Sequence, residues 1–126
     1  MFDHISIGVR DIARTGRFYD SALKPLGLSR LSDGETSLGY GRDAVGLWIL
    51  LADHPVAADP QSGLHFCFAA PNSRSVADFH AAALAAGGTD NGAPGLRTDY
   101  GPDYLAAYVI DPDGYRLEAY CSVAQA

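Results

Sequence analysis

The stretch Tyr104–Cys121, which reads YLAAYVIDPDGYRLEAYC, carries the clearest fold signal in this chain. Two apolar, aromatic-rich runs flank the Asp-Pro-Asp-Gly segment at 111–114. This segment is typical of a tight turn, because proline presets the backbone angle φ and glycine accepts the left-handed conformation that follows. The stretch therefore predicts a β-hairpin near the end of the sequence, with Tyr108 opposite Glu118.

Glu118 is the unusual residue of this predicted hairpin. Because side chains alternate along a strand, Glu118 shares a face with Arg116 and Tyr120, while the apolar residues between them face the core. A carboxylate inside an apolar strand is costly unless it is paired or binds a metal. Glu118 is therefore a candidate ligand or catalytic residue, and a salt bridge with Arg116 is the structural alternative.

The composition is that of one globular domain. The chain has 126 residues, of which 48% are hydrophobic and 19% are charged, and this length suits a single core of ordinary size. The formal net charge of -6 argues against nucleic acid or an anionic membrane as a partner. No apolar run reaches the roughly 20 residues of a membrane span, and we expect no signal peptide.

The two cysteines, Cys67 and Cys121, both lie in predicted strands. They lack the spacing of a metal-binding Cys-x-x-Cys motif, and alternation places them on opposite faces. We therefore expect reduced thiols in a cytoplasmic protein rather than a disulfide.

The first half of the chain has the pattern of a strand, a helix and three more strands. Asp11 is placed to cap the helix, and Pro25 and Gly27 are placed to end it. The predicted elements are a strand over 3–9, a helix from 12 to about 23, and strands over 28–31, 36–40 and 45–51.

The second half starts the same pattern again. A strand over 64–70 directs Leu64 to the core, and the helix that follows buries Leu84. The segment 89–103 is rich in glycine and proline and is predicted as a loop. Because this loop is long for a compact domain, residues 90–103 are expected to form a substrate lid.

The two halves are a repeat with an offset of 61 residues. The matched positions include a strand start, a helix cap, core positions and a helix stop, and they are His4 with His65, Asp11 with Asn72, Phe18 with Phe79, Leu23 with Leu84, and Gly27 with Gly88. Such self-similarity predicts a duplicated βαβββ unit in one α+β domain. We expect module 1 at about 1–53, a linker at about 54–62 and module 2 at about 63–126.

His4, His65 and Glu118 are the candidate metal ligands. All three lie on the polar side of apolar strands, so they converge if the two sheets join into a curved whole. Two imidazoles and one carboxylate form a facial triad, which leaves coordination positions open for water or substrate. Each residue alone is more often structural, but the repeat-related placement of the two histidines favours the metal site.

These residues carry a family resemblance. The sequence resembles the vicinal oxygen chelate superfamily, which covers glyoxalase I, bleomycin resistance proteins, fosfomycin resistance enzymes and extradiol dioxygenases. The matching motifs are His-x-Ser-x-x-Val-x-Asp from His4, Leu-His-Phe-x-Phe from Leu64, and Asp-Pro-Asp-Gly-x-x-x-Glu from Asp111. Together they cover nearly the whole chain, and the closing motif is the most specific.

The resemblance implies a fold, a cofactor and an assembly. It implies two tandem βαβββ modules that form a curved, cup-like mixed sheet around one divalent metal ion, which is Fe²⁺, Mn²⁺, Zn²⁺ or Ni²⁺. It also implies that His4, His65 and Glu118 are the ligands, and that the chain forms a homodimer, often with ligands from both subunits.

Departures from the family pattern narrow the implied activity. Glyoxalase I has a fourth ligand on the strand that here spans 45–51, where Trp48 stands instead of a carboxylate or amide. Fosfomycin resistance enzymes need a cationic tail, and the residues after Cys121 include no lysine or arginine. Extradiol dioxygenases share the triad but use a further histidine as acid-base catalyst, which the sequence does not reveal.

Several residues are predicted to contact a substrate inside the cup. Tyr108, opposite Glu118, is expected to donate a hydrogen bond or act as a weak acid, so both are candidate catalytic residues. An aromatic cross-strand pair is the alternative role of Tyr108. The predicted substrate-binding residues are Ser6, Trp48, Cys67, Arg97, Tyr100, Tyr108, Arg116 and Tyr120.

The sequence therefore predicts a metal-dependent enzyme of the glyoxalase or dioxygenase type. It would be a lyase, an isomerase or a ring-cleaving dioxygenase whose small substrate chelates the metal through vicinal oxygens, with the metal as Lewis acid. The alternative is a metal-free protein that binds an aromatic small molecule, as bleomycin resistance proteins do. Uptake of a divalent ion separates the two.

Overall fold

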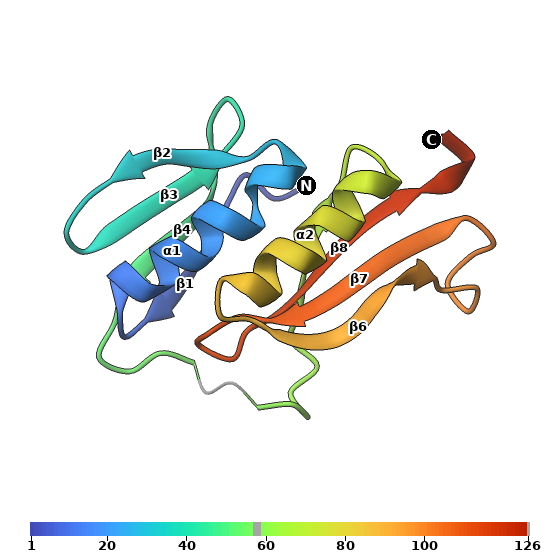
Figure 1. Ribbon diagram of the computed structural model, residues 1–126. Coiled ribbons are helices and arrows are strands. Elements are labelled where there is room, and N and C mark those ends of the chain that lie inside the picture. Colours follow the sequence, from blue (N-terminus) through green and yellow to red (C-terminus); the bar gives the residue numbers. More distant parts are fainter. Residues whose placement is uncertain (57–58, 126) are drawn as a thin grey trace.

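The computed structural model describes residues 1–56 and 59–125, which form two modules of the same kind (Figure 1). The first contains β1 (Ile5–Val9), α1 (Ile12–Ala22), the 3₁₀ helix η1 (Lys24–Leu26), β2 (Ser29–Asp33), β3 (Ser37–Gly41) and β4 (Val45–Leu51). The second contains β5 (Phe66–Ala69), α2 (Ser73–Ala85), β6 (Thr89–Leu96), β7 (Tyr104–Ile110), β8 (Arg116–Ser122) and the 3₁₀ helix η2 (Val123–Gln125). The predicted α+β class and duplicated βαβββ unit are confirmed. The predicted linker includes residues 57 and 58, which lie outside the described residues.

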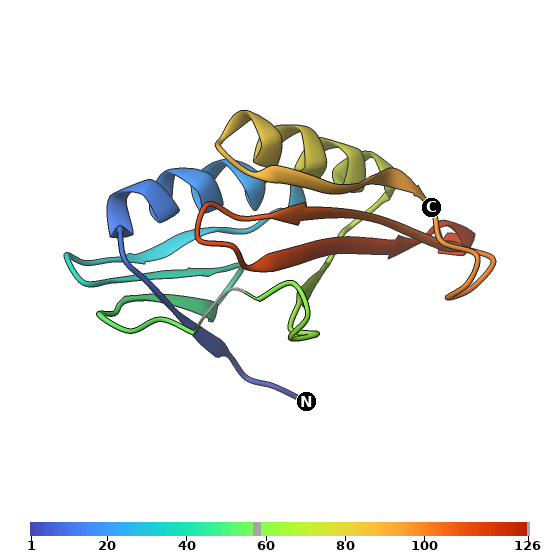
Figure 2. The same ribbon diagram turned by 90° about the horizontal axis from the view of Figure 1, so that it is seen from below.

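Each module folds its four strands into one mixed sheet. The strand orders are β1-β4-β3-β2 and β5-β8-β7-β6. In each sheet the first strand pairs in parallel with the last, and the other pairs are antiparallel. Both helices lie on the same side of the strands (Figure 2), so the opposite face of each sheet is free of helices. Within the described ranges, no helix has the length and apolar character needed to span a membrane.

Polar side chains begin both helices at the predicted positions. The backbone N–H of Arg14 donates to Oδ1 of Asp11 (3.0 Å), and the N–H of Ser75 donates to Oδ1 of Asn72 (2.9 Å). These bonds satisfy donors that a helix start would otherwise leave unpaired. Gly27, with φ of 79°, follows η1 in the left-handed conformation that glycine adopts most readily.

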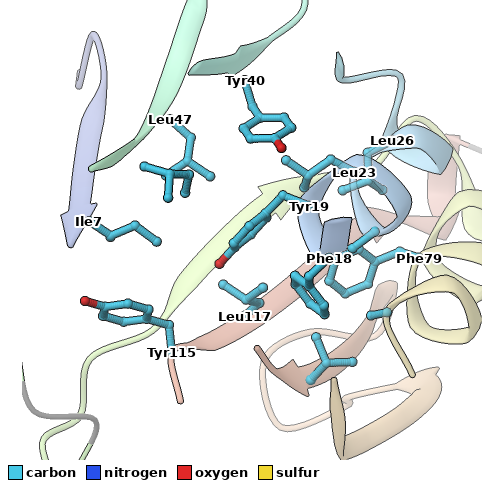
Figure 3. Close-up of a cluster of buried hydrophobic side chains, with 14 of the residues drawn as sticks. Ile7, Phe18, Tyr19, Leu23, Leu26, Tyr40, Leu47, Phe79, Tyr115 and Leu117 are labelled. Carbon is cyan, nitrogen blue, oxygen red and sulfur yellow. The ribbon is translucent and has the colours of Figure 1, made fainter. Parts of the chain in front are cut away.

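One apolar core joins the two modules. Phe18 and Tyr19 of α1, Phe79 of α2 and Leu117 of β8 belong to a single buried cluster (Figure 3). The ring of Phe18 lies so close to Gly88 that a Cβ at this glycine would be 2.9 Å from the ring. The helices of the two modules therefore share a continuous interior, and the repeat folds as one body.

The prediction that Leu64 and Leu84 lie in the core is wrong. Leu64 is 43% exposed and Leu84 is 37% exposed. β5 begins only at Phe66, so Leu64 precedes the strand and its alternation does not apply. On α2 the neighbouring Ala83 takes the buried position, which turns Leu84 outward.

The predicted loop 89–103 is also wrong over its first half, because residues 89–96 form β6. This strand lies at the edge of the second sheet and pairs with β7 through two register shifts, one between Asp90 and Gly92 and one between Gly92 and Gly95. Pro94 falls within the second shift, and an edge strand with bulges tolerates the missing N–H of proline. Only 97–103 connects β6 to β7, so half of the predicted lid, residues 90–96, is part of the sheet.

The predicted hairpin is confirmed, including the pairing of Tyr108 with Glu118. Its turn also buries a carboxylate, since Asp111 is only 3% exposed. Asp111 accepts hydrogen bonds from the hydroxyl of Tyr19 (2.5 Å) and from the backbone N–H groups of Asp113 (2.9 Å) and Tyr115 (2.8 Å). The hairpin of module 2 is thereby fixed to α1 of module 1.

Two further residues of the turn strengthen this connection. The carboxylate of Asp113 accepts hydrogen bonds from Arg14 (2.7 Å) and from the hydroxyl of Thr15 (2.6 Å), both on α1. The hydroxyl of Tyr115 donates to the backbone oxygen of Gly8 on β1 (2.7 Å). Polar contacts and the shared core together set the relative position of the modules.

Asp111 makes the stability of this connection depend on pH. Burial raises the pKa of Asp111 to about 6, although its hydrogen bonds act in the opposite direction. The unfolded value is about 3.9, so the folded chain binds this proton more tightly. The resulting stabilisation is present below about pH 4 and is lost as the pH rises through about 6.

The quantity to compare is the free energy of unfolding of the wild type minus that of Asp111→Asn. We expect this difference to be about 2 kcal/mol larger at pH 4 than at pH 7.5. The variant cannot titrate at this position and lacks that component. Urea unfolding followed by circular dichroism at both pH values measures it. Asp43→Asn, on the exposed surface, is the control. The free energy of unfolding of the wild type minus that of this variant should change by less than about 0.5 kcal/mol between the two pH values. A difference that stays constant with pH would contradict the assignment.

Candidate functional site

A pocket of about 390 Å³ opens on the helix-free face of the second sheet. Alternation along β8 explains its position, because Leu117 points to the core and the residues on either side point away from it. The lining residues are Gly63, His65, Asn91, Tyr100, Tyr104, Tyr108, Arg116, Leu117 and Glu118.

Glu118 lies at the centre of the hydrogen bonds in this pocket. It is only 3% exposed, and both of its carboxylate oxygens have partners. Nε2 of His65 lies 3.0 Å from Oε1, and the hydroxyl of Tyr104 donates to Oε2 at 2.5 Å. The His65 side chain is 50% exposed, so the pair faces the pocket.

The groups around Glu118 keep their protons at neutral pH. Burial, followed by the charge of Glu118, raises the pKa of Tyr108 to about 12 and that of the Cys67 thiol to about 12. Burial and the hydrogen bond to Glu118 also raise the pKa of Tyr104. The two phenols are therefore hydrogen-bond donors rather than bases, and Cys67 is not a thiolate nucleophile.

His4 lies apart from this pocket. It precedes β1 on the first sheet, is exposed, and its Nδ1 lies 2.6 Å from Oδ1 of Asp3. Over residues 1–56 and 59–125, no group of three or more His, Cys, Asp or Glu side chains is arranged to hold a metal. One chain thus brings together two of the three predicted ligands, His65 and Glu118.

Comparison with protein families identifies the superfamily of this chain. The family model of the Glyoxalase/Bleomycin resistance protein/Dioxygenase superfamily matches residues 1–119. The chain belongs to this superfamily. A search of curated proteins finds no match.

Solved structures of superfamily members share the fold. A glyoxalase/bleomycin resistance protein from Albidiferax ferrireducens T118 is 31% identical, with a TM-score of 0.85 over 95% of this chain and 98% of that one. The fosfomycin resistance protein FosX from Listeria monocytogenes is 16% identical, with a TM-score of 0.70 over 95% and 91%. A bleomycin-binding protein solved with bleomycin is 22% identical, with a TM-score of 0.61 over 95% and 97%. The last two likenesses concern the fold alone.

Within this superfamily fold, the predicted substrate-binding residues fall into three groups. Tyr100, Tyr108 and Arg116 line the pocket beside Glu118, and Tyr120 lies behind its wall, with its ring tilted against that of Tyr104 and centroids 4.1 Å apart. Arg97 lines an adjoining cavity of about 420 Å³ that Tyr100 and Tyr108 also border. The residues outside these cavities are Ser6, Trp48 and Cys67, of which the first two are paired on β1 and β4.

Cys67 lines a third cavity, an apolar cleft of about 630 Å³ between the modules. Its walls include Ile5 and Leu47 from the first module and Phe66 from the second, and His65 borders this cleft as well as the pocket. His65 therefore lies between the pocket on the second sheet and the apolar cleft that β1 borders.

Sequence reasoning missed Tyr104 as a site residue. It was assigned to the predicted hairpin without a role in the site, but its hydroxyl donates a hydrogen bond to Glu118 from the start of β7. Alternation contained the signal, because Tyr104 and Tyr108 are four positions apart on one strand and so share a face. Asn91, on β6, was missed because that strand was predicted as a loop.

Glycines on β6 make room for the wall between the two polar cavities. The guanidinium of Arg97 lies 5.2 Å from the ring centroid of Tyr108, in a cation–π arrangement. A Cβ at Gly92 would lie 2.8 Å from Cδ1 of Tyr108 and 3.2 Å from the Arg97 guanidinium. Gly92 also has φ of 152°, which a residue with a side chain rarely adopts.

We expect Gly92→Ala to lower the free energy of unfolding by about 1–2 kcal/mol, because it combines backbone strain with a clash against Tyr108. Gly46→Ala on β4 is the matched control, since a Cβ there would have no atom within 4 Å. It should change stability by less than about 0.5 kcal/mol. Chemical denaturation measures both, and equal effects of the two variants would refute the packing role of Gly92.

Proposed function

We propose that this chain is a divalent-metal-dependent enzyme of the glyoxalase or dioxygenase type, acting on a small substrate in the pocket at Glu118. The supporting observation is the separation of 3.0 Å between Nε2 of His65 and Oε1 of Glu118 at the pocket surface. Imidazole nitrogen and carboxylate oxygen are ligand types accepted by Fe²⁺, Mn²⁺, Zn²⁺ and Ni²⁺. The metal identity and the reaction within this group stay open to experiment.

These donors fit a divalent ion in kind, and a third is needed to complete the set. Catalytic metal sites of this type use three protein ligands, so we assign the third position to His4 of a second copy. The exposed apolar side chains next to the two histidines support this assignment, since Phe2 is 77% exposed and Leu64 is 43% exposed. Exposed apolar surface and unpaired edge strands, here β1 and β5, favour self-association.

The remaining residues of the pocket have roles that follow from their contacts. A bound metal would supply Lewis-acid chemistry. Tyr104 holds one oxygen of Glu118 in place and so orients the other toward His65. Tyr108, which stays protonated because its pKa is raised, donates a hydrogen bond to an oxygen of the substrate.

The second candidate function is that of a metal-free protein that binds a small molecule. For either candidate we propose a cytoplasmic location. The aromatic walls of the pocket, formed by Tyr100, Tyr104 and Tyr108, favour the metal-free protein, because stacked rings hold a flat ligand without any metal. The bleomycin-binding protein solved with bleomycin shows that this fold can hold a small molecule. Metal uptake distinguishes the two candidates.

We expect the metal-free wild type to bind one Mn²⁺, Zn²⁺ or Ni²⁺ per chain in isothermal titration calorimetry. His65→Ala, Glu118→Gln and His4→Ala should each weaken binding at least 10-fold, a scale set by the effect of residues that only support ligands. His80→Ala is the control, because His80 pairs with Asp90 outside the pocket. A wild type that takes up no divalent ion would contradict the metal-dependent enzyme and favour the binding-protein alternative.

Mixing two variants that each bind metal weakly tests whether the metal site is shared between two copies of the chain. In a symmetric dimer whose sites each combine His4 of one copy with His65 and Glu118 of the other, a heterodimer of His4→Ala with Glu118→Gln regains one intact site. Random reassociation should then restore tight binding at about one site in four. If the mixture binds no better than the separate variants, His4 does not complete the site of a second copy.

A further inference from the structure

Arg116 is a cation at the pocket wall that the fold does not pair with an acid. It is half-buried at the start of β8 and lies on the face of Glu118. Other arginines form salt bridges with carboxylates, among them Arg14 with Asp113 and Arg30 with Asp20. Within residues 1–56 and 59–125, the arginines that form salt bridges are Arg14, Arg30 and Arg74, and Arg116 is not among them.

The structural alternative for Arg116 is a salt bridge with Glu118, and the contacts that Glu118 makes are with other residues. One oxygen of that carboxylate meets His65 and the other meets Tyr104. Glu118 is also the only acidic side chain among the described residues that line the pocket. The planar, permanently charged guanidinium therefore has its donors available for an anion that enters from outside.

Aromatic rings form much of the remaining wall of the pocket, which Tyr100, Tyr104 and Tyr108 line. The ring of Tyr104 packs at a tilt between those of Tyr100 and Tyr120, with centroid separations of 5.3 and 4.1 Å. The ring of Tyr108 stands nearby and is backed by the guanidinium of Arg97. A cavity of about 390 Å³ lies in the size range of small-molecule sites, and aromatic walls favour a planar occupant.

We propose that this pocket takes a planar aromatic substrate that carries a carboxylate, and that Arg116 is the residue that binds the carboxylate. The ring of the substrate lies against the tyrosines, and its anionic group faces Arg116. The inference rests on the proposed function for the position of the reacting end, which faces His65 and Glu118. The contact with Arg116 needs no metal and can be measured separately.

The test compares 3,4-dihydroxybenzoate with the uncharged and nearly isosteric 3,4-dihydroxybenzamide by isothermal titration calorimetry, on the full-length protein as purified and again with added Mn²⁺. We expect the wild type to bind the carboxylate at least about 10-fold more tightly than the amide, the scale of one charge-assisted bidentate contact. Arg116→Gln should reduce this ratio to about 2-fold or less and leave the affinity for the amide unchanged.

Arg17→Gln is the matched control for the loss of one positive charge, because Arg17 is exposed on α1. It should keep the full preference for the carboxylate. Benzoate should also bind about 5-fold more tightly than cyclohexanecarboxylate if the tyrosine walls select a planar ring. Circular dichroism of each variant verifies the fold.

Equal affinities for carboxylate and amide in the wild type would overturn the inference, as would a preference that survives in Arg116→Gln. Failure of all these ligands to bind would overturn it as well. The proposed function is judged separately by the metal titrations of the His4, His65 and Glu118 variants. If the protein takes up metal but binds carboxylate and amide equally well, the proposed function stands and the role assigned to Arg116 is wrong.

Discussion

A buried carboxylate must be surrounded by hydrogen-bond donors, and this constraint organises the structure around the hairpin β7–β8. The hairpin buries two acids, Asp111 in its turn and Glu118 in its second strand, and each is only 3% exposed. Each also accepts a hydrogen bond of 2.5 Å from a tyrosine hydroxyl, Tyr19 for Asp111 and Tyr104 for Glu118. Without such donors the cost of burying either charge would amount to several kcal/mol.

The two acids differ in where their donors come from. The partners of Asp111 come from α1 and from the turn itself, so this residue fixes the hairpin to the first module. The partners of Glu118 lie on β7 and just before β5, at the edge of a pocket. The same strand pairing therefore joins the modules at one end and forms part of the pocket wall at the other.

Alternation and turn chemistry were sufficient to predict what depends on local geometry. They placed Glu118 opposite Tyr108 and on the face of Arg116, and the repeat placed the caps Asp11 and Asn72. Where tertiary pairing overrides local preference, sequence reasoning failed. β6 forms through its long pairing with β7 despite glycine and proline, because an edge strand tolerates bulges.

The predicted convergence of His4 with His65 and Glu118 does not follow from either half of the repeat. It depends on how the two sheets meet, and no rule of periodicity describes that junction. In one chain the sheets are separate, with β1 and β5 each at an edge, so equivalent positions in the repeat do not imply neighbouring side chains. The pairing of His65 with Glu118 has a simpler origin, because β5 and β8 are adjacent strands.

The environment of Glu118 also bears on whether the site is structural or functional. A pair kept only for stability would gain little from His65, since an ion pair with a half-exposed partner contributes at most about 1 kcal/mol. An apolar residue at this position of β8 would avoid the cost of burying a carboxylate altogether. Tyr104 binds one oxygen of Glu118, so a ligand that reaches the other oxygen competes with His65 alone. The arrangement thus places one imidazole nitrogen and one carboxylate oxygen side by side at a cavity, which stability alone does not require.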